Sequence, residues 1–261
     1  MKIDPTTLDT QTLAPLFAAF EESGARLLYV GGCIRNAVRG VAATDIDLST
    51  DATPDQMRRI AQTRGIRAVD TGADHGTLTF FLGGKSYEIT TFRKDIRTDG
   101  RHAEVVFGTS LEDDAARRDF TMNALYAEAS GQVIDPLEGL ADAQTGRLRF
   151  IGEPKARIVE DYLRILRFFR FWAWHGDPLE GVDAEALAAC ADLQSGLERI
   201  SKERIGAEVL KLLAANDPAP ALAAMEAAGI LGRRLPGASA PPVSRFGLGD
   251  HGRAPASARL S

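Results

Sequence analysis

Two aspartates, Asp45 and Asp47, stand on either side of the apolar Ile46. On a β-strand, residues i and i+2 face the same side, so both carboxylates would project together while Ile46 points to the core. Carboxylates this close repel unless a cation compensates them, and Mg²⁺ prefers carboxylate oxygens with waters or substrate phosphates as further ligands. The spacing therefore indicates a magnesium site, although a polar strand end in a turn explains it equally well.

Glu88 could add a third carboxylate, because it lies in the middle of a predicted strand over residues 86–92. It would join Asp45 and Asp47 if its strand were adjacent to theirs. Taken alone, it is typical of a charge on an edge strand.

A phosphate-binding turn is indicated by Gly31, Gly32 and Arg35, between a predicted strand and a predicted helix over residues 35–39. Glycines let backbone N–H groups approach a phosphate closely, and arginine adds a forked, permanent cation. A tight turn without a ligand is the alternative, and the sequence matches no known dinucleotide or P-loop pattern.

A second polar cluster lies in the stretch RRDFTMNA, residues 117–124, within a helix predicted over residues 111–128. Arg118 could hold phosphate and Asp119 a ribose hydroxyl, with Asn123 beside them. Ion pairs on a solvated helix face would give the same pattern.

A third cluster places Arg164, Arg167 and Arg170 at intervals of three residues, preceded by Asp161 at the same interval. On one helix over residues 155–174 these four side chains would share a slowly rotating face. Such a face suits a nucleotide, because arginine binds phosphate and an Asp–Arg pair can bind a base edge. Ion pairing between neighbouring turns is the alternative.

The elements that must position these residues divide the chain in two. Residues 1–150 alternate strands and helices, whereas residues 151–235 show only helical patterns, and residues 236–261 are a low-complexity stretch that predicts a disordered tail. A Gly-Gly pair at residues 83–84 predicts a hairpin, and the charged residues 94–104 predict an exposed loop. The predicted strands are residues 26–30, 44–48, 66–70, 77–82 and 86–92. Further helices are predicted at residues 13–23, 53–64, 184–193 and 202–215, and Thr53 is the predicted N-cap of the second of these.

Composition excludes several classes of protein. With two cysteines, Cys33 and Cys190, in 261 residues, a disulfide scaffold is excluded and a reducing, cytoplasmic compartment is expected. No stretch approaches the ~20 apolar residues of a membrane span, and the N-terminus does not resemble a signal peptide. Scattered histidines argue against zinc. A net charge of −5 leaves open a local basic groove. The oligomeric state is not indicated.

Together these residues resemble the class II tRNA nucleotidyltransferase (CCA-adding enzyme) and bacterial poly(A) polymerase family. The resemblance rests on five blocks in the family's order, namely GGCIR with the DID pair, TGADHGT, EITTFR, RRDFTMNA and EDYLRILRFFRF. It implies an α+β fold, in which a polymerase-β-like nucleotidyltransferase head, a mixed sheet with flanking helices, precedes an all-helical neck domain.

The resemblance also implies the reaction and its partners. An RNA 3′-hydroxyl, on tRNA, would attack the α-phosphate of CTP or ATP and release pyrophosphate, with two Mg²⁺ ions on Asp45 and Asp47. Glu88 matches the third acidic position. The nucleotide-binding positions matched are Gly31, Gly32, Arg35, Arg118, Asp119, Asn123, Asp161, Arg164, Arg167 and Arg170.

Asp161 and Arg164 match the pair that reads the incoming base. Cytosine and adenine each present an exocyclic amine beside a ring-nitrogen acceptor, which suit Asp161 and Arg164 respectively. Uracil and guanine present a carbonyl beside an N–H and would mismatch both contacts.

The TGADHGT block and the loop over residues 99–104 favour CCA addition over poly(A) synthesis. Asn36 departs from the family, which commonly has Asp there. The family-like sequence fades near Leu235, which suggests a C-terminally truncated member. Activity of the 261-residue chain, C-only or A-only addition, and a remnant that only binds nucleotide or RNA all stay open.

Overall fold

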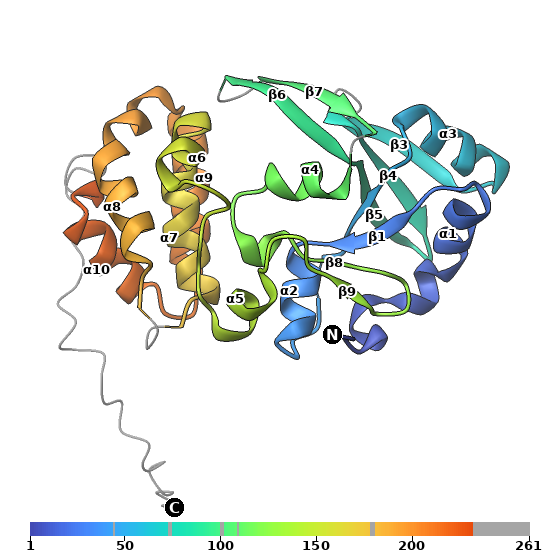
Figure 1. Ribbon diagram of the computed structural model, residues 1–261, viewed down its shortest axis with the longest axis horizontal. Coiled ribbons are helices and arrows are strands. Elements are labelled where there is room, and N and C mark those ends of the chain that lie inside the picture. The colour runs from blue at the N-terminus through green and yellow to red at the C-terminus, as the bar shows by residue number, and fades with distance from the viewer. Residues whose placement is uncertain (44, 73–74, 100–101, 109, 178–180, 232–261) are drawn as a thin grey trace, which may run out of the picture.

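The computed structural model describes residues 1–43, 45–72, 75–99, 102–108, 110–177 and 181–231, and the predicted tail over residues 236–261 lies outside them. Figure 1 shows the strands at one end of the molecule and the helices that follow α5 at the other. This arrangement agrees with the expected α+β architecture of a mixed sheet followed by helices.

Seven strands form one mixed sheet in the order β3-β4-β5-β2-β1-β8-β9. Only β2 and β5 run parallel among these neighbours. The apolar β1 is buried along its whole length, as a central strand should be. The strands are β1 Leu27–Val30, β2 Asp47–Thr50, β3 Arg67–Gly72, β4 Thr77–Leu82, β5 Lys85–Thr91, β8 Tyr126–Ala127 and β9 Val133–Ile134.

Helices accompany the sheet in its N-terminal half, namely the 3-10 helix η1 (Pro5–Leu8), α1 (Thr10–Glu22), α2 (Gly32–Val38) and α3 (Pro54–Thr63). α1 buries one apolar stripe that includes Leu13, Leu16 and Phe20. Thr53 caps α3 as the sequence predicts, in a capping box with Gln56. The predicted hairpin between β4 and β5 is confirmed.

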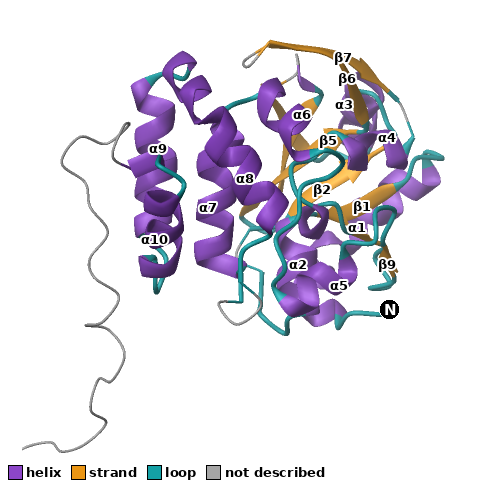
Figure 2. Ribbon diagram, turned by 60° about the vertical axis from the view of Figure 1, so that its left-hand side comes forward, coloured by secondary structure: helices purple, strands orange, loops and turns teal. Residues whose placement is uncertain are grey.

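The prediction of an exposed loop over residues 94–104 is wrong. β6 (Arg93–Asp99) and β7 (His102–Phe107) pair antiparallel as a separate two-stranded sheet. Figure 2 shows this ribbon at the top of the view. Hydrophobic alternation predicts strands that bury one face against a core. The strands β6 and β7 form a two-stranded sheet apart from the main sheet, so this signal did not indicate them.

The prediction of one helix over residues 111–128 is also wrong. α4 (Leu111–Ala116) ends after six residues, and a 3-10 turn, η3 (Thr121–Asn123), leads into β8. Between them Phe120 is extended and forms a β-bridge with Phe150. The buried Phe120 ring lies against Phe150, Phe168 and Phe171, so tertiary packing overrides the helical pattern.

The helix predicted over residues 155–174 is two helices, α6 (Pro154–Glu160) and α7 (Leu163–His175), separated at Asp161, whose backbone is extended. The other helices from residue 135 onward are α5 (Leu140–Thr145), α8 (Ala184–Leu193), η4 (Gln194–Arg199), α9 (Lys202–Leu213) and α10 (Ala219–Ala227). No described helix has the length and apolar character to cross a membrane.

Candidate active site

The acidic residues of the predicted metal site gather at the start of β2. Asp47 opens β2 and pairs in register with Glu88 of the parallel β5, so the condition for a third carboxylate beside Asp47 is met. Registered residues share one face of a sheet. Asp45 lies in a bend before β2 rather than on a strand, because the predicted strand over residues 44–48 begins only at Asp47.

The electrostatics of Asp47 favour a cation. Burial raises the pKa of the Asp47 carboxyl, as do the negative charge of Glu88 and, to a smaller extent, that of Asp45. The positive charge of Arg118 only partly offsets this increase. A divalent cation would relieve this repulsion. Among the described residues, no three His, Cys, Asp or Glu side chains converge tightly enough to hold a metal by themselves. The oxygen donors nevertheless fit a cation that keeps water or phosphate oxygens as ligands.

The glycine turn follows β1 directly. Gly31 has φ 74°, a conformation that favours glycine, and a Cβ there would lie 3.5 Å from Arg118 Nη1. The helix begins at Gly32 rather than at Arg35 as predicted, because this turn ends the strand at Val30. Arg35 therefore lies inside α2, with its side chain turned into the protein and only 6% exposed.

Arg35 is held by amides instead of carboxylates. Its Nη1 donates to Asn123 Oδ1 at 2.5 Å, and its Nη2 donates to Asn36 Oδ1 at 3.2 Å. Burial, and then the charge of Arg39, lower the pKa of Arg35 to about 10. The guanidinium still carries its charge at neutral pH. Because both of these contacts are to amide oxygens, neither of them neutralises the charge, and it can attract an anion.

Arg117 and Arg118 converge on a carboxylate that the sequence analysis missed. Asp114 of α4 has no exposed side-chain surface, and it accepts from both arginines and, at 2.7 Å, from Tyr126 Oη. Burial opposes its ionisation, yet the charges of Arg118 and Arg117 and the Tyr126 hydrogen bond hold the pKa of Asp114 below its usual value. In the sequence Asp114 looks like an ordinary acid in the first turn of a helix.

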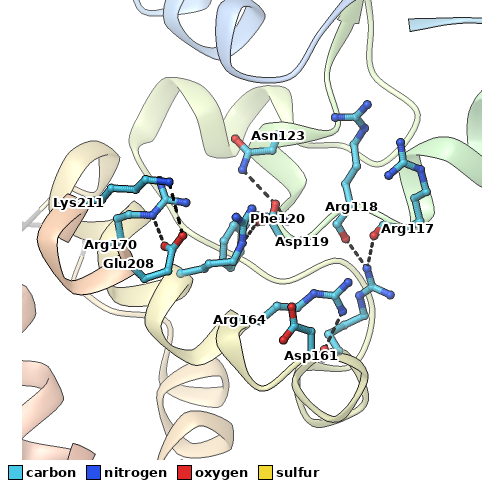
Figure 3. A network of polar contacts seen from close by, with 12 residues as sticks. Arg117, Arg118, Asp119, Phe120, Asn123, Asp161, Arg164, Arg170, Glu208 and Lys211 are labelled. Atoms are coloured by element: carbon cyan, nitrogen blue, oxygen red, sulfur yellow. Dashed lines mark hydrogen bonds and ion pairs between the residues drawn. The ribbon is translucent and has the colours of Figure 1, made fainter. Parts of the chain in front are cut away.

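Asp119 is enclosed in a similar network, shown in Figure 3. Its carboxylate accepts from Arg167 Nε at 3.0 Å, from Asn123 Nδ2 at 3.1 Å and from the Phe120 amide at 2.9 Å. Burial disfavours the charge, but Arg167 and these hydrogen bonds hold the pKa of Asp119 low. Asp119 therefore connects the segment after α4 to α7.

The four residues Asp161, Arg164, Arg167 and Arg170 do not share one helix face, because Asp161 precedes α7. Asp161 Oδ1 accepts from the amide of Leu163, the first residue of α7, at 3.1 Å. Its Oδ2 accepts from Arg204 of α9 at 2.7 Å rather than from Arg164. The prediction that these four residues share one helix face is thus wrong, and the alternative of i,i+3 ion pairing does not hold between Asp161 and Arg164.

The remaining arginines of α7 also have partners that the sequence pattern did not reveal. Arg164 Nη1 donates to Glu160 of α6 at 2.5 Å, and Arg170 Nε donates at 2.6 Å to Glu208, which is 5% exposed. Arg164 is therefore ion-paired, but with Glu160 outside the stripe and not with a residue of the stripe, and the partner of Arg170 comes from α9. Glu160 stands one residue before Asp161 and could have been recognised as an i,i+4 partner. Glu208 could not, because its contact is tertiary.

A partly buried arginine, Arg157, joins the segment after α4 to α6. Arg157 Nη2 donates to the backbone carbonyls of Arg117 and Arg118, at 2.7 and 2.5 Å, and Nη1 donates to Glu160 at 2.6 Å. Glu160 in turn holds Arg164, so one chain of hydrogen bonds runs from the segment after α4 to α7.

These groups line one cavity of about 790 Å³ between the sheet and α7. Every predicted site residue lines it except Glu88, which lines an adjacent hollow of about 940 Å³ that also includes Asp45 and Asp47. Two residues missed by the sequence analysis, Arg204 and His175, line it as well. Burial, with the charges of nearby arginines, lowers the pKa of His175 to about 3, so its imidazole is neutral at physiological pH.

Family models match two parts of the chain. The poly A polymerase head domain matches residues 27–149, and the probable RNA and SrmB-binding site of polymerase A matches residues 181–240. The human mitochondrial CCA tRNA nucleotidyltransferase 1 is 43% identical over 211 residues, which are 80% of this chain and 49% of that protein. The chain belongs to the CCA-adding enzyme and poly(A) polymerase family.

Other members of the family support the same placement. The CCA-adding enzyme of Lacticaseibacillus paracasei is 38% identical over 83% of this chain and 53% of its own length. The crystal structure of the Bacillus stearothermophilus CCA-adding enzyme in complex with CTP superimposes with a TM-score of 0.75 at 32% identity, covering 84% of this chain and 52% of that one. The fold expected from the family, a nucleotidyltransferase head followed by helices, is therefore confirmed. The chain spans about half the length of these relatives.

Proposed function

We propose that this chain carries the catalytic centre of a CCA tRNA nucleotidyltransferase, which adds C and A from CTP and ATP to the 3′ end of tRNA. The observation that carries the proposal is the single cavity that brings the Asp45–Asp47 carboxylates, the Arg35 turn and the Asp161–Arg164 corner together. Relatives named as CCA-adding enzymes support it, as does the relative solved in complex with CTP.

In this proposal the 3′-oxygen of the RNA attacks the α-phosphorus, the bond from that phosphorus to the β-phosphate oxygen breaks, and pyrophosphate leaves. Asp45 and Asp47, with Glu88 beside them, would hold Mg²⁺, which would supply charge for activating the hydroxyl and stabilising the leaving group. Arg35 and Arg118 would hold the triphosphate from the other wall. Fixed cations aimed at developing negative charge are a large source of rate enhancement.

Selection of the base would fall to Asp161 and Arg164. A carboxylate has about four lone-pair sites, and Asp161 uses two of them for the Leu163 amide and Arg204. It can therefore still accept from the exocyclic amine of cytosine or adenine. Arg164 uses Nη1 for Glu160 and the Arg157 carbonyl, and the N–H groups of its Nε and Nη2 can donate to the ring nitrogen.

The organisation proposed for the chain is a head over residues 1–150 and a helical neck with part of a body over residues 151–235. A cytoplasmic location is proposed as well. Its support is that Cys33 and Cys190 are both buried free thiols, as a reducing compartment would leave them.

The test is nucleotide incorporation on a tRNA that ends at the discriminator base, with Mg²⁺ and CTP alone, ATP alone, or both. Ordered addition of two C and one A is the expected result, and Asp47→Asn should abolish it while circular dichroism shows a folded protein. Long A tails would assign the chain to poly(A) synthesis, and C-only or A-only products to half of the reaction. Absence of any product would refute the proposed activity for this chain.

A further inference from the structure

The α6–α7 corner that presents Asp161 is supported from η4 and α9. A Cβ on Gly196 would come within 1.9 Å of the Tyr162 ring, so Tyr162 packs directly on the backbone of η4. The Arg199 guanidinium lies 5.4 Å from the centre of the same ring. Because Tyr162 follows Asp161, these contacts fix the point at which the chain leaves α6 and enters α7.

The carboxylate of Asp161 is fixed by the same support. Arg204, in the first turn of α9, donates from Nη2 to Oδ2 at 2.7 Å, while the Leu163 amide donates to Oδ1. Two donors on two different oxygens define both the position and the plane of a carboxylate. The Arg204 and Asp161 side chains are 29% and 24% exposed, so the ion pair is partly shielded from water and yet faces the cavity.

The other half of the proposed base-reading pair does not depend on α9. Arg164 is held by Glu160 and by the Arg157 carbonyl, both on α6. Removing Arg204 would therefore release the acceptor half of the pair and leave the donor half in place.

We propose that Arg204 is a specificity-determining positioning residue, which holds the Asp161 carboxylate where it accepts from the exocyclic amine of the incoming base. The inference rests on the proposed function and adds α9 to the elements that set base selection. Without Arg204 the Asp161 carboxylate can turn away from the base edge. The amine of cytosine or adenine is then bound less tightly, and the carbonyl of uracil or guanine is rejected less strongly.

The test compares Arg204→Met and Arg204→Lys with the unaltered chain and with Lys202→Met, a substitution at an exposed position of the same helix. The readout is kcat/KM for single incorporation of CTP, ATP, UTP and GTP. Arg204→Met should lower the preference for CTP over UTP about tenfold, the usual effect of losing one charge-assisted hydrogen bond. Arg204→Lys should restore most of it, because one N–H donor makes the contact to Oδ2, and Lys202→Met should change nothing.

Equilibrium binding of CTP and UTP, measured by calorimetry, separates this inference from the proposed activity. If the unaltered chain transfers no nucleotide, the proposed activity fails, and a preference for CTP in binding that Arg204→Met removes would still support the positioning role. Unchanged selectivity in a folded Arg204→Met variant, in transfer or in binding, would overturn it.

Discussion

Replacing Asp114 by Asn should destabilise the protein through uncompensated charge. The carboxylate has no exposed surface and faces Arg117 and Arg118, whose side chains are 16% and 19% exposed. Asn keeps the shape and can still hydrogen-bond with Tyr126, but it leaves two guanidinium groups close together without a counter-charge. The substitution therefore tests the charge of Asp114 more than its packing.

The magnitude follows from what it costs to remove one partner of a buried ion pair, about 3–5 kcal/mol. We expect the lower end, about 3 kcal/mol, because water still reaches both arginines. For a chain of this size each kcal/mol corresponds to roughly 2–4 °C, so the melting midpoint should fall by roughly 6–12 °C. Thermal and urea unfolding followed by circular dichroism measure both quantities. Asp113→Asn is the matched control. The Asp113 carboxylate is one-third exposed, and it forms an ion pair with the exposed Lys94.

The dependence on pH gives the sharper test. The folded-state pKa of Asp114 lies below its unfolded value, so its stabilisation is complete above the unfolded pKa and is lost as pH falls through the folded pKa. The difference in unfolding free energy between the unaltered chain and Asp114→Asn should thus be constant near neutral pH and shrink below about pH 4. A difference that does not change down to the acid transition, or one no larger than that of Asp113→Asn, would refute the reasoning.

Three further substitutions test other contacts. Asn36→Asp should raise the Kd for CTP about fivefold, because a carboxylate 3.2 Å from Arg35 would compete with the triphosphate for the positive charge of Arg35. Calorimetry measures the Kd, and an unchanged value would contradict this. Gly196→Ala should cost about 1–3 kcal/mol in thermal unfolding, because its methyl group would overlap the Tyr162 ring; a neutral effect would mean that the corner relaxes freely. Thr53→Ala should cost about 1 kcal/mol in urea unfolding by removing the α3 cap, whereas Thr53→Ser should retain most of it.

The sequence was most informative where a single element buries one face. The strand predicted over residues 77–82 coincides with β4, and the cap at Thr53 was placed correctly, because alternation and capping are local signals. The adjacency of Asp47 and Glu88 could be stated only as a condition, because nothing in one sequence reveals which strands pair.

The errors arise where tertiary contacts decide local structure. Leu163, Leu166 and Phe169 keep a helical period, so the pattern does not reveal that the chain is extended at Asp161. Likewise, Phe120 interrupts the helical pattern in order to join an aromatic cluster. The partners of the arginine stripe were missed for a related reason.

Arg170 and Asp161 find their partners 38 and 43 residues away, on α9. A spacing rule for neighbouring turns of one helix says nothing about such contacts. Nucleotide binding by the stripe therefore stays a prediction, and the sequence did not indicate which residues orient the stripe.

The contact of Arg157 with two main-chain carbonyls has a consequence for how the site tolerates sequence change. Any amino acid at positions 117 and 118 supplies the same two carbonyl acceptors, so the contact does not depend on the side chains there. It does depend on the guanidinium of Arg157. Substitutions at 117 and 118 therefore leave the contact between α6 and the segment after α4 in place. In a library restricted to Lys and Arg at positions 117, 118 and 157, which keeps a cation beside the buried Asp114, folded variants should be abundant at the first two positions and scarce at the third.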